Sequence, residues 1–259
     1  MLGSYETFKK QIFHLTQIDL SSYKENQMRR RIDSLISKNG LLSYDAYVEL
    51  IRKDKEKFEQ FVNYLTINVS EFYRDPDQWK YLDTVVIPEL IHRFGKNLKI
   101  WSAACSTGNE PYSLVMAFSR HLPLYQIRVV ATDIDKQVLE TAKLGLYAEK
   151  SLLHVPADLK NRFFKKVGNA YQISREIQNC VEFREHNLLK DVYPFGYHLI
   201  VCRNVLIYFT EEARDEVYRK FHRSLVKDGV LFIGTAEQMI NFKELNYQRK
   251  NVVFYGKEM

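Results

Sequence analysis

The chain has 259 residues, a formal net charge of +6 and 46% hydrophobic residues. These values are close to those of globular proteins, and they exclude wholesale disorder and a collagen-like fibre. No apolar run approaches the roughly 20 residues that span a bilayer, and the first ten residues lack the apolar stretch of a secretory signal. We therefore expect a cytoplasmic protein with one large domain or two unequal ones.

Cysteines and histidines give little support for disulfide or metal chemistry. Cys105, Cys180 and Cys202 are far apart and form no CxxC motif, so neither a disulfide framework nor a zinc knuckle is expected. The seven histidines are scattered and include no HExxH, so we predict no metal site. The 38 basic residues are balanced by 32 acidic ones, and charge alone therefore does not distinguish nucleic acid from an acidic protein surface.

The first 74 residues have the pattern of a helical domain. Apolar side chains recur at helical spacing, and there is little glycine or proline. Asn39-Gly40 is a helix-stop signal, and Ser43 is placed to cap the next helix. We predict a small all-α N-terminal domain with its linker over residues 1–75.

After Pro88, short β-rich runs alternate with helical stretches, which predicts a mainly parallel sheet covered by helices. The alternation begins with a strand at 98–104, a turn at 105–109, a helix at 110–120 and a strand at 127–133. Further strands are predicted at 181–187, 197–202, 229–234 and 252–255, with a helix at 211–225. Residues 76–259 are therefore predicted to form an α/β domain with a doubly wound sheet.

The alternation is interrupted between about residues 148 and 185. A helical piece at 156–164 is followed by a hairpin pattern around Gly168-Asn169. We predict that a small antiparallel β-subdomain is inserted here.

Two residues of the first strand–turn–helix–strand unit suggest a ligand. In open α/β sheets, ligands bind beyond the carboxyl ends of the strands. Gly108 would let the backbone approach a ligand, but the turn lacks the GxGxxG pattern of a dinucleotide site. Asp133, at the end of the second strand, is placed to accept hydrogen bonds from both hydroxyls of a ribose. A nucleoside-bearing ligand is predicted, although a turn glycine and a helix-capping aspartate would give the same pattern without one.

Four ordered motifs resemble those of the CheR family of chemotaxis receptor methyltransferases. They are Asn68-Val-Ser-Glu-Phe-Tyr-Arg74, Ile100-Trp-Ser-Ala-Ala-Cys-Ser-Thr-Gly-Asn-Glu-Pro-Tyr-Ser113, Ala131-Thr-Asp-Ile-Asp135 and Val201-Cys-Arg-Asn-Val-Leu-Ile-Tyr-Phe209. The resemblance covers almost the whole chain, including the helical N-terminal part and the insertion. It implies a Rossmann-like methyltransferase domain preceded by a helical domain that recognises receptors.

The resemblance also implies the reaction. S-adenosylmethionine would be the methyl donor, and glutamate side chains on the cytoplasmic methylation helices of chemoreceptors would be the acceptors. The products would be γ-glutamyl methyl esters and S-adenosylhomocysteine. A glutamate with a reference pKa of about 4.3 is already ionised at pH 7, so positioning should dominate catalysis. We expect a monomer that meets membranes only through receptors and binds no nucleic acid.

The resemblance assigns roles to individual residues. The expected cofactor contacts are Asn68, Ser70, Arg74, Gly108, Glu110, Asp133, Asn187, Leu188, Arg203 and Asn204. Arg74 and Tyr208 match family residues near the transferring methyl; a guanidinium can bind the acceptor carboxylate, and a phenol can align it. Without the motifs, the favoured interpretation is structural, with Arg74 as a cap at a helix C-terminus and Tyr208 as a residue at the rim of the core; the motifs reverse this preference.

The sequence gives weaker evidence for the residues that contact the receptor than for those that contact the cofactor. Arg29 and Arg31, on an amphipathic N-terminal helix, could contact the acidic methylation helices, with a solvated basic face as the alternative. In some family members the insertion binds a C-terminal pentapeptide of the receptor by strand addition. The compact hairpin predicted here favours weak or no peptide docking.

This sequence departs from the family pattern at two positions. Ser70 stands where many relatives have threonine, which keeps the hydroxyl. Asn109 stands where relatives often have glutamate, which removes a charge beside Glu110. Cys105 lies in the cofactor turn and is expected to be a packing residue, because methyl transfer needs no covalent intermediate.

Two other classes of function remain as alternatives. A nucleic-acid methyltransferase is disfavoured because there is no Asp/Asn-Pro-Pro-Tyr segment and no stripe of aromatic and basic residues. A non-catalytic adaptor that senses S-adenosylmethionine would lose the acceptor-side residues, whereas Arg74 and Tyr208 are both present.

Overall fold

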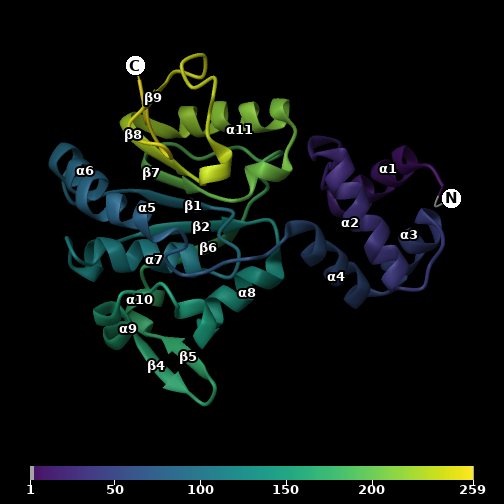
Figure 1. Cartoon of the computed structure of the whole chain (residues 1–259), viewed down its shortest axis with the longest axis horizontal. Helices are drawn as coiled ribbons and strands as arrows, with labels where there is room; N and C mark the ends of the chain where they lie inside the picture. The colour runs from purple at the N-terminus through teal and green to yellow at the C-terminus, as the bar shows by residue number, and fades with distance from the viewer. Residues whose placement is uncertain (1–2, 259) are drawn as a thin grey trace. The chain divides into compact units, whose positions relative to one another are not determined.

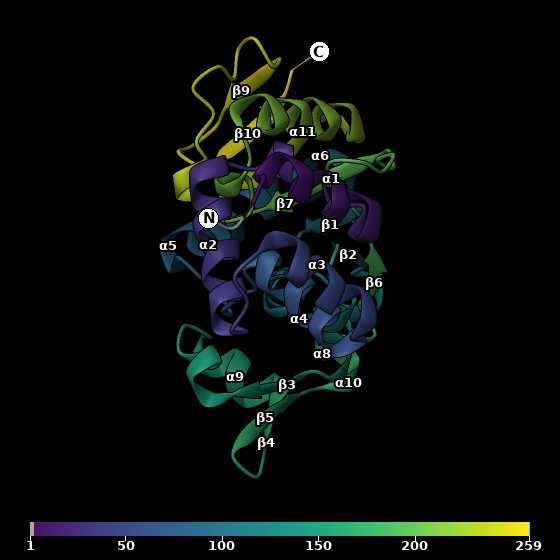
Figure 2. The ribbon, with the colours of Figure 1, turned by 90° about the vertical axis from the view of Figure 1, so that its right-hand side faces the viewer.

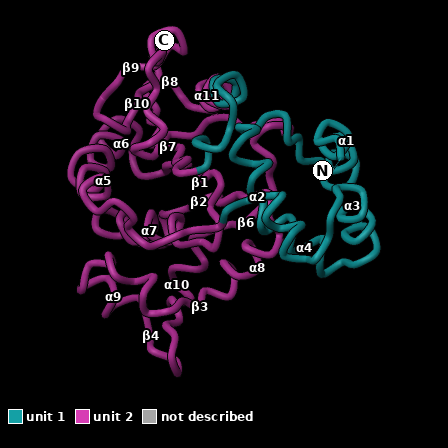
Figure 3. Tube along the Cα trace, turned by 45° about the vertical axis from the view of Figure 1, so that its right-hand side comes forward, with its two compact units in different colours: residues 1–67, 205–216 teal, residues 68–204, 217–259 magenta. Residues whose placement is uncertain are grey.

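The computed structural model describes residues 3–258, which form a helical part followed by an α/β part (Figure 1). They divide into two compact units (Figure 3). The first contains residues 3–67 and 205–216, and the second contains residues 68–204 and 217–258. The division falls at Ile67, within the expected range of residues 1–75, which included the linker as well as the helices. The first unit also includes a later segment, residues 205–216, that the sequence pattern did not assign to it.

The first unit is all-helical, as predicted. Its helices are α1 (Tyr5–Thr16), η1 (Leu20–Ser22), α2 (Glu25–Lys38), α3 (Tyr44–Lys53), α4 (Lys55–Thr66) and η5 (Leu206–Tyr208), and α11 (Glu211–Ser224) begins in it. Ser43 caps α3 by accepting a hydrogen bond from the backbone N–H of Ala46, and α2 ends at the predicted Asn39-Gly40 stop. Such caps satisfy backbone groups that have no partner inside the helix.

Aromatic side chains fill the core of the first unit. The Phe8 ring lies 4.7 Å from the Tyr44 ring and 6.4 Å from the Phe61 ring, and all three side chains are buried. The segment 205–216 joins this unit through its backbone, because Lys24 donates its N–H to the Tyr208 carbonyl at 2.9 Å. The rings of Tyr23 and Phe209 meet edge to face. These contacts fix Tyr208 to the N-terminal helices.

The second unit is built on a seven-stranded sheet with the order β6-β2-β1-β7-β8-β10-β9. Its strands are β1 (Ile100–Ala103), β2 (Val129–Asp133), β6 (Val181–Glu185), β7 (Tyr197–Cys202), β8 (Leu225–Ile233), β9 (Tyr247–Arg249) and β10 (Phe254–Lys257). The first five strands in this order are parallel, and β10 is antiparallel to both of its neighbours. The predicted doubly wound, mainly parallel sheet is therefore confirmed.

Helices cover the sheet on both faces, with α7 (Asn109–Phe118) and α11 on opposite sides of the strands (Figure 1). All four residues of β1 are buried, which is typical of a central parallel strand. The other helices of this unit are α5 (Pro76–Tyr81), η2 (Leu82–Val86), α6 (Ile87–Phe94), η3 (Leu124–Gln126), α8 (Lys136–Leu144), η4 (Glu149–Leu152), α9 (Ala157–Phe163), α10 (Arg175–Gln178) and η6 (Thr235–Glu237). None of the helices between residues 3 and 258 is long and apolar enough to cross a membrane.

A small antiparallel sheet forms the inserted subdomain (Figure 2). Its order is β3 (Leu146–Ala148), β5 (Ala170–Ile173), β4 (Phe164–Val167), and the β4–β5 hairpin turns at Gly168-Asn169 as predicted. The expected range of about 148–185 needs correction at both ends. The small sheet begins at Leu146, and residues 181–185 belong to the main sheet as its edge strand β6.

Candidate functional site

The turn between β1 and α7 brings backbone close to the carboxyl edge of the sheet. Gly108 has φ of +86°, and a Cβ at this position would lie 2.8 Å from the Cβ of Ala142 in α8. Glycine is therefore needed both for the conformation and for the packing of the turn against α8. Ala104 and Ser106 also have positive φ, so the turn is strained on both sides of Cys105. Cys105 itself is buried, as expected of a packing residue.

Asp133 links this turn to the end of β2. Its Oδ2 accepts a hydrogen bond from the Ser106 N–H at 2.8 Å, and its Oδ1 accepts one from the Asp135 N–H at 3.0 Å. Burial raises the pKa of Asp133 to about 6, against the lowering effect of these backbone donors. Because each carboxylate oxygen can accept two hydrogen bonds, capacity remains for two hydroxyl donors.

Asn68 brings the linker to the same place. Its Nδ2 donates to Oδ2 of Asp135 at 3.0 Å, and its Oδ1 lies 3.5 Å from the Ser106 hydroxyl. Ser70, two residues later, is half-buried. The linker, the β1 turn and the β2 end are thus neighbours in the structure, and they bring together Asn68 and Asp133, two of the expected cofactor contacts.

Glu110 lies in the first turn of α7. Its Oε1 accepts a hydrogen bond from the Ser102 hydroxyl at 2.8 Å, and its Oε2 lies 3.8 Å from Nη1 of Arg203. Burial raises the pKa of Glu110 to about 7, although Arg203 and Ser102 act in the opposite direction. Asn109 is buried and accepts a hydrogen bond from the Thr107 hydroxyl, so it stabilises the turn.

Arg203 follows β7, and its guanidinium contacts an aromatic ring and several oxygen atoms of the protein. Its guanidinium stacks 4.8 Å from the centre of the Phe232 ring. Its Nη2 donates to the Arg74 carbonyl, to Oδ2 of Asp75 and to Oε1 of Gln78. Arg203 was predicted as a cofactor contact from its motif, and the structure adds that it binds the backbone that carries Arg74.

Asn204 and Glu237 join the ends of β7 and β8. Asn204 has φ of +61°, and its N–H donates to Oε2 of Glu237 at 2.7 Å. The same oxygen accepts the Gly234 N–H at 2.8 Å, and Glu237 is buried. Sequence reasoning missed Glu237. The available signal was an acidic residue shortly after the buried strand β8, in the short helix η6.

Asn187 and Leu188 form the loop after β6. The Asn187 N–H donates to Oδ2 of Asp191, and its Oδ1 accepts the Leu189 N–H. This loop starts beside Asp133, because the preceding residue, His186, donates its N–H to the Asp133 carbonyl at 2.9 Å. Leu188 is buried. The structure therefore brings this loop to the β2 end.

The acceptor-side residues belong to different units. Arg74 is half-buried in the second unit, and its Nη1 lies 3.4 Å from the Val69 carbonyl. Tyr208 ends η5 in the first unit. Arg74 therefore lies on the linker that reaches Asn68, whereas Tyr208 is fixed to the N-terminal helices.

Arg29 and Arg31, the two arginines expected to contact receptors, differ in exposure and in their contacts within the first unit. Arg29 is exposed, and its guanidinium lies 5.3 Å from the centre of the Tyr5 ring. Arg31 is half-buried, donates from Nη2 to the Tyr64 carbonyl at 2.6 Å and stacks on the Tyr64 ring. Arg31 therefore has an intramolecular role that the sequence did not indicate.

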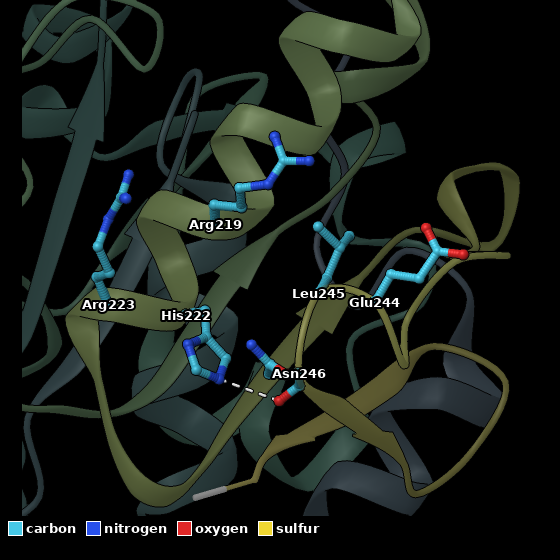
Figure 4. A pocket seen from close by; sticks show the side chains of 6 residues that line it. All are labelled: Arg219, His222, Arg223, Glu244, Leu245 and Asn246. Carbon is cyan, nitrogen blue, oxygen red and sulfur yellow. Dashed lines mark hydrogen bonds between the residues drawn. The ribbon is translucent and has the colours of Figure 1, made fainter.

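A surface pocket of about 240 Å³ lies between α11 and the loop before β9, away from these residues in the sequence (Figure 4). It is lined by Arg219, His222, Arg223, Glu244, Leu245 and Asn246. The imidazole of His222 is 3.0 Å from the Asn246 carbonyl. The pocket contains none of the residues that the motifs assigned to cofactor or acceptor. In the described part of the chain, no group of three or more His, Cys, Asp or Glu side chains is arranged to hold a metal ion.

A doubly wound sheet, a glycine turn after β1 and a buried aspartate at the end of β2 define a nucleoside-binding α/β domain. Residues 68–254 match the family model of the CheR methyltransferase SAM binding domain, and residues 3–66 match that of the CheR methyltransferase all-alpha domain. The chain belongs to the CheR methyltransferase family, as the motifs indicated, and is an S-adenosylmethionine-dependent methyltransferase.

Curated relatives cover nearly the whole chain. A "Chemotaxis protein methyltransferase" from Listeria monocytogenes is 39% identical over 93% of this chain and 92% of the relative. A protein of the same name from Listeria innocua is 40% identical over the same shares. Among solved structures, a TehB-like SAM-dependent methyltransferase from Corynebacterium glutamicum is 17% identical, with a TM-score of 0.40, over 71% of this chain and 96% of that one.

The residues at the sheet edge suit S-adenosylmethionine. Asp133 has oxygens for the ribose hydroxyls, and Gly108 keeps side-chain atoms out of the turn. Glu110 is a buried carboxylate, which matches the positive charge of the methionyl end and the sulfonium.

Proposed function

We propose that this protein transfers the methyl group of S-adenosylmethionine to glutamate side chains of membrane chemoreceptors in the cytoplasm. The products are γ-glutamyl methyl esters and S-adenosylhomocysteine. The observation that carries this proposal is the pair of family matches over residues 3–66 and 68–254, in a fold that gathers Asn68, Glu110 and Asp133 at one sheet edge. Relatives named chemotaxis protein methyltransferases support the receptor as substrate.

The proposed cofactor residues divide by chemistry. Bound S-adenosylmethionine supplies an activated methyl on a sulfonium. Asp133 binds the ribose hydroxyls, and Glu110 binds the positively charged methionyl end. Backbone at Gly108 approaches the ligand, while polar and apolar groups of the linker and of the strand-end loops surround it. These surrounding residues are Asn68, Ser70, Asn187, Leu188 and Asn204.

The acceptor side needs positioning rather than a base. The receptor carboxylate is ionised at neutral pH and attacks the methyl directly. Arg74 binds this carboxylate, and Tyr208 aligns it, so both residues act on the geometry of transfer. Because Tyr208 is carried by the N-terminal helices, receptor recognition and acceptor alignment involve the same unit.

The N-terminal helical domain is proposed to recognise the receptor. Arg29 is exposed on α2 and can meet an acidic methylation helix. Arg31 donates to the Tyr64 carbonyl within the domain, and we therefore assign it a smaller share of the receptor contact than Arg29. No observation favours the adaptor or the nucleic-acid methyltransferase.

The proposal is tested by transfer of labelled methyl from S-adenosylmethionine to membranes that carry chemoreceptors. Alkali should release the label as methanol, because carboxyl methyl esters hydrolyse in base. Membranes without receptors are the control. Alkali-stable label would indicate another acceptor atom, and cofactor binding without any transfer would support the adaptor.

A further inference from the structure

The backbone on both sides of Arg74 has an unusual conformation. Tyr73 has φ of +51° and Asp75 has φ of +62°, in the left-handed region that residues with side chains rarely adopt. Such strain persists only where surrounding contacts hold it, and it gathers at functional sites. The position of the Arg74 side chain therefore depends on whatever fixes this turn.

Arg203 provides the main contact. Its Nη2 lies 2.8 Å from the Arg74 carbonyl, 2.8 Å from Oδ2 of Asp75 and 2.9 Å from Oε1 of Gln78. The Arg74 carbonyl also accepts a hydrogen bond from Nε1 of Trp79. The side chain of Arg203 is only 2% exposed, so its charge needs nearby carboxylates, and Asp75 is closer to it than Glu110 is.

Gln78 extends this network to a third segment. Its Oε1 accepts from Arg203, and its Nε2 donates to the Thr235 hydroxyl at 2.6 Å. Thr235 begins η6, in which Glu237 binds the N–H of Asn204. The turn that carries Arg74, the end of β7 and the end of β8 are therefore held together through one amide.

We propose that Asp75 and Gln78 are positioning residues for methyl transfer, acting through Arg203 on the backbone of Arg74. Neither residue is among those assigned to cofactor or acceptor. The inference rests on the proposed function, because it assumes that Arg74 binds the acceptor carboxylate. Asp75 holds the buried charge of Arg203 at the turn, and Gln78 ties the turn to η6.

Gln78→Met tests the proposal, since methionine has a similar length and makes neither hydrogen bond. We expect kcat for receptor methylation to fall at least about tenfold, while the Kd for S-adenosylhomocysteine changes by less than about threefold. Gln78→Glu keeps an acceptor for Arg203, and its other carboxylate oxygen can accept from the Thr235 hydroxyl in place of the amide donor, so it should recover most of the activity. Lys80→Met, at an exposed position of the same helix, is the matched control and should transfer at the wild-type rate.

A double-variant comparison separates positioning from general stability. If Gln78 acts through Arg74, Gln78→Met should add no further loss in an Arg74→Ala background. Additive losses, or wild-type kcat in Gln78→Met, would overturn the proposal. Should Gln78→Met fail to fold, Thr235→Val removes only the hydrogen bond between Gln78 and η6 from its exposed side; kcat should again fall with an unchanged Kd for S-adenosylhomocysteine, and wild-type kcat would overturn the proposal. A wild-type protein that methylates no receptor would overturn both proposals, whereas wild-type transfer with an unaffected Gln78 variant overturns this one alone.

Discussion

Ser106 donates its N–H to Oδ2 of Asp133 at 2.8 Å, so the turn after β1 and the end of β2 share one buried carboxylate. The Asp135 N–H occupies the other oxygen. Asp133 therefore has a structural role before any ligand binds. A ligand with two neighbouring hydroxyls would complete its hydrogen bonding.

Asp133→Ala should weaken the binding of S-adenosylhomocysteine by about a hundredfold, because two hydrogen bonds to a charged group are lost, each contributing about 1.5 kcal/mol. Isothermal titration calorimetry measures this change, and the melting temperature reports any loss of the Ser106 contact. Glu140→Gln, at an exposed position of α8, is the matched control. Binding at the wild-type level in Asp133→Ala would remove this residue from the cofactor site.

Arg74→Lys and Tyr208→Phe should leave cofactor binding within about threefold of wild type and lower kcat by about tenfold or more. Lysine keeps the charge but loses bidentate binding of a carboxylate, and phenylalanine keeps the ring but loses the hydroxyl. Calorimetry and initial rates of receptor methylation give the two quantities. An equal loss of binding in Asp133→Ala and both of these variants would contradict the division between cofactor and acceptor residues.

Cofactor affinity should fall as the pH decreases from 8 to 6. Burial raises the pKa of Glu110 to about 7, and only the ionised form attracts a positive ligand. Below this pKa, Glu110 must lose its proton when the cofactor binds. At one pH unit below the pKa, this lowers the affinity about tenfold. In Glu110→Gln the dependence between pH 8 and pH 6 should flatten. The same slope in wild type and variant would assign the effect to Asp133, whose pKa is raised to about 6.

Replacing Arg29 and Arg31 should have different effects. Arg29→Glu should raise the KM for receptors at low salt, with less effect at high salt, because an exposed charge acts through screened attraction. Arg31→Gln should lower the free energy of unfolding by about 1 kcal/mol, since its hydrogen bond to Tyr64 is lost. Methylation rates at two salt concentrations and chemical denaturation check these outcomes. An unchanged KM in Arg29→Glu would exclude this residue from the receptor contact.

Gly108→Ala should destabilise the protein by about 2 kcal/mol, because the added methyl meets Ala142 at 2.8 Å and the residue has positive φ. Gly168→Ala is a control for conformation alone. Gly168 also has positive φ, but no atom lies within 4 Å of the place that an added methyl would take. The difference between the two variants in denaturant unfolding isolates the steric part. If both variants lose the same free energy of unfolding, the turn at Gly108 can relax around an added side chain.

The sequence predicted the central strands because β1, β2 and β7 are short, mostly apolar runs between helical stretches. The strands β3 and β9 have only three residues each, which is too short for an alternation of apolar and polar residues to predict them. For the candidate site, the motifs pointed to Asp133 and Glu110 as expected cofactor contacts. They could not identify Glu237, because a buried acid that accepts the N–H of Asn204, 33 residues earlier, has the same local pattern as an exposed one.

The first unit contains two separate stretches of chain, since residues 205–216, between β7 and β8, join helices α1–α4. The polypeptide therefore passes between the units three times, at Ile67, Asn204 and Glu216. A fragment that starts at Asn68 would leave the Phe209 ring without Tyr23 and the Tyr208 carbonyl without Lys24. The two units thus cannot be separated by cutting at the linker, because a chain shortened there would lose the contacts that hold residues 205–216.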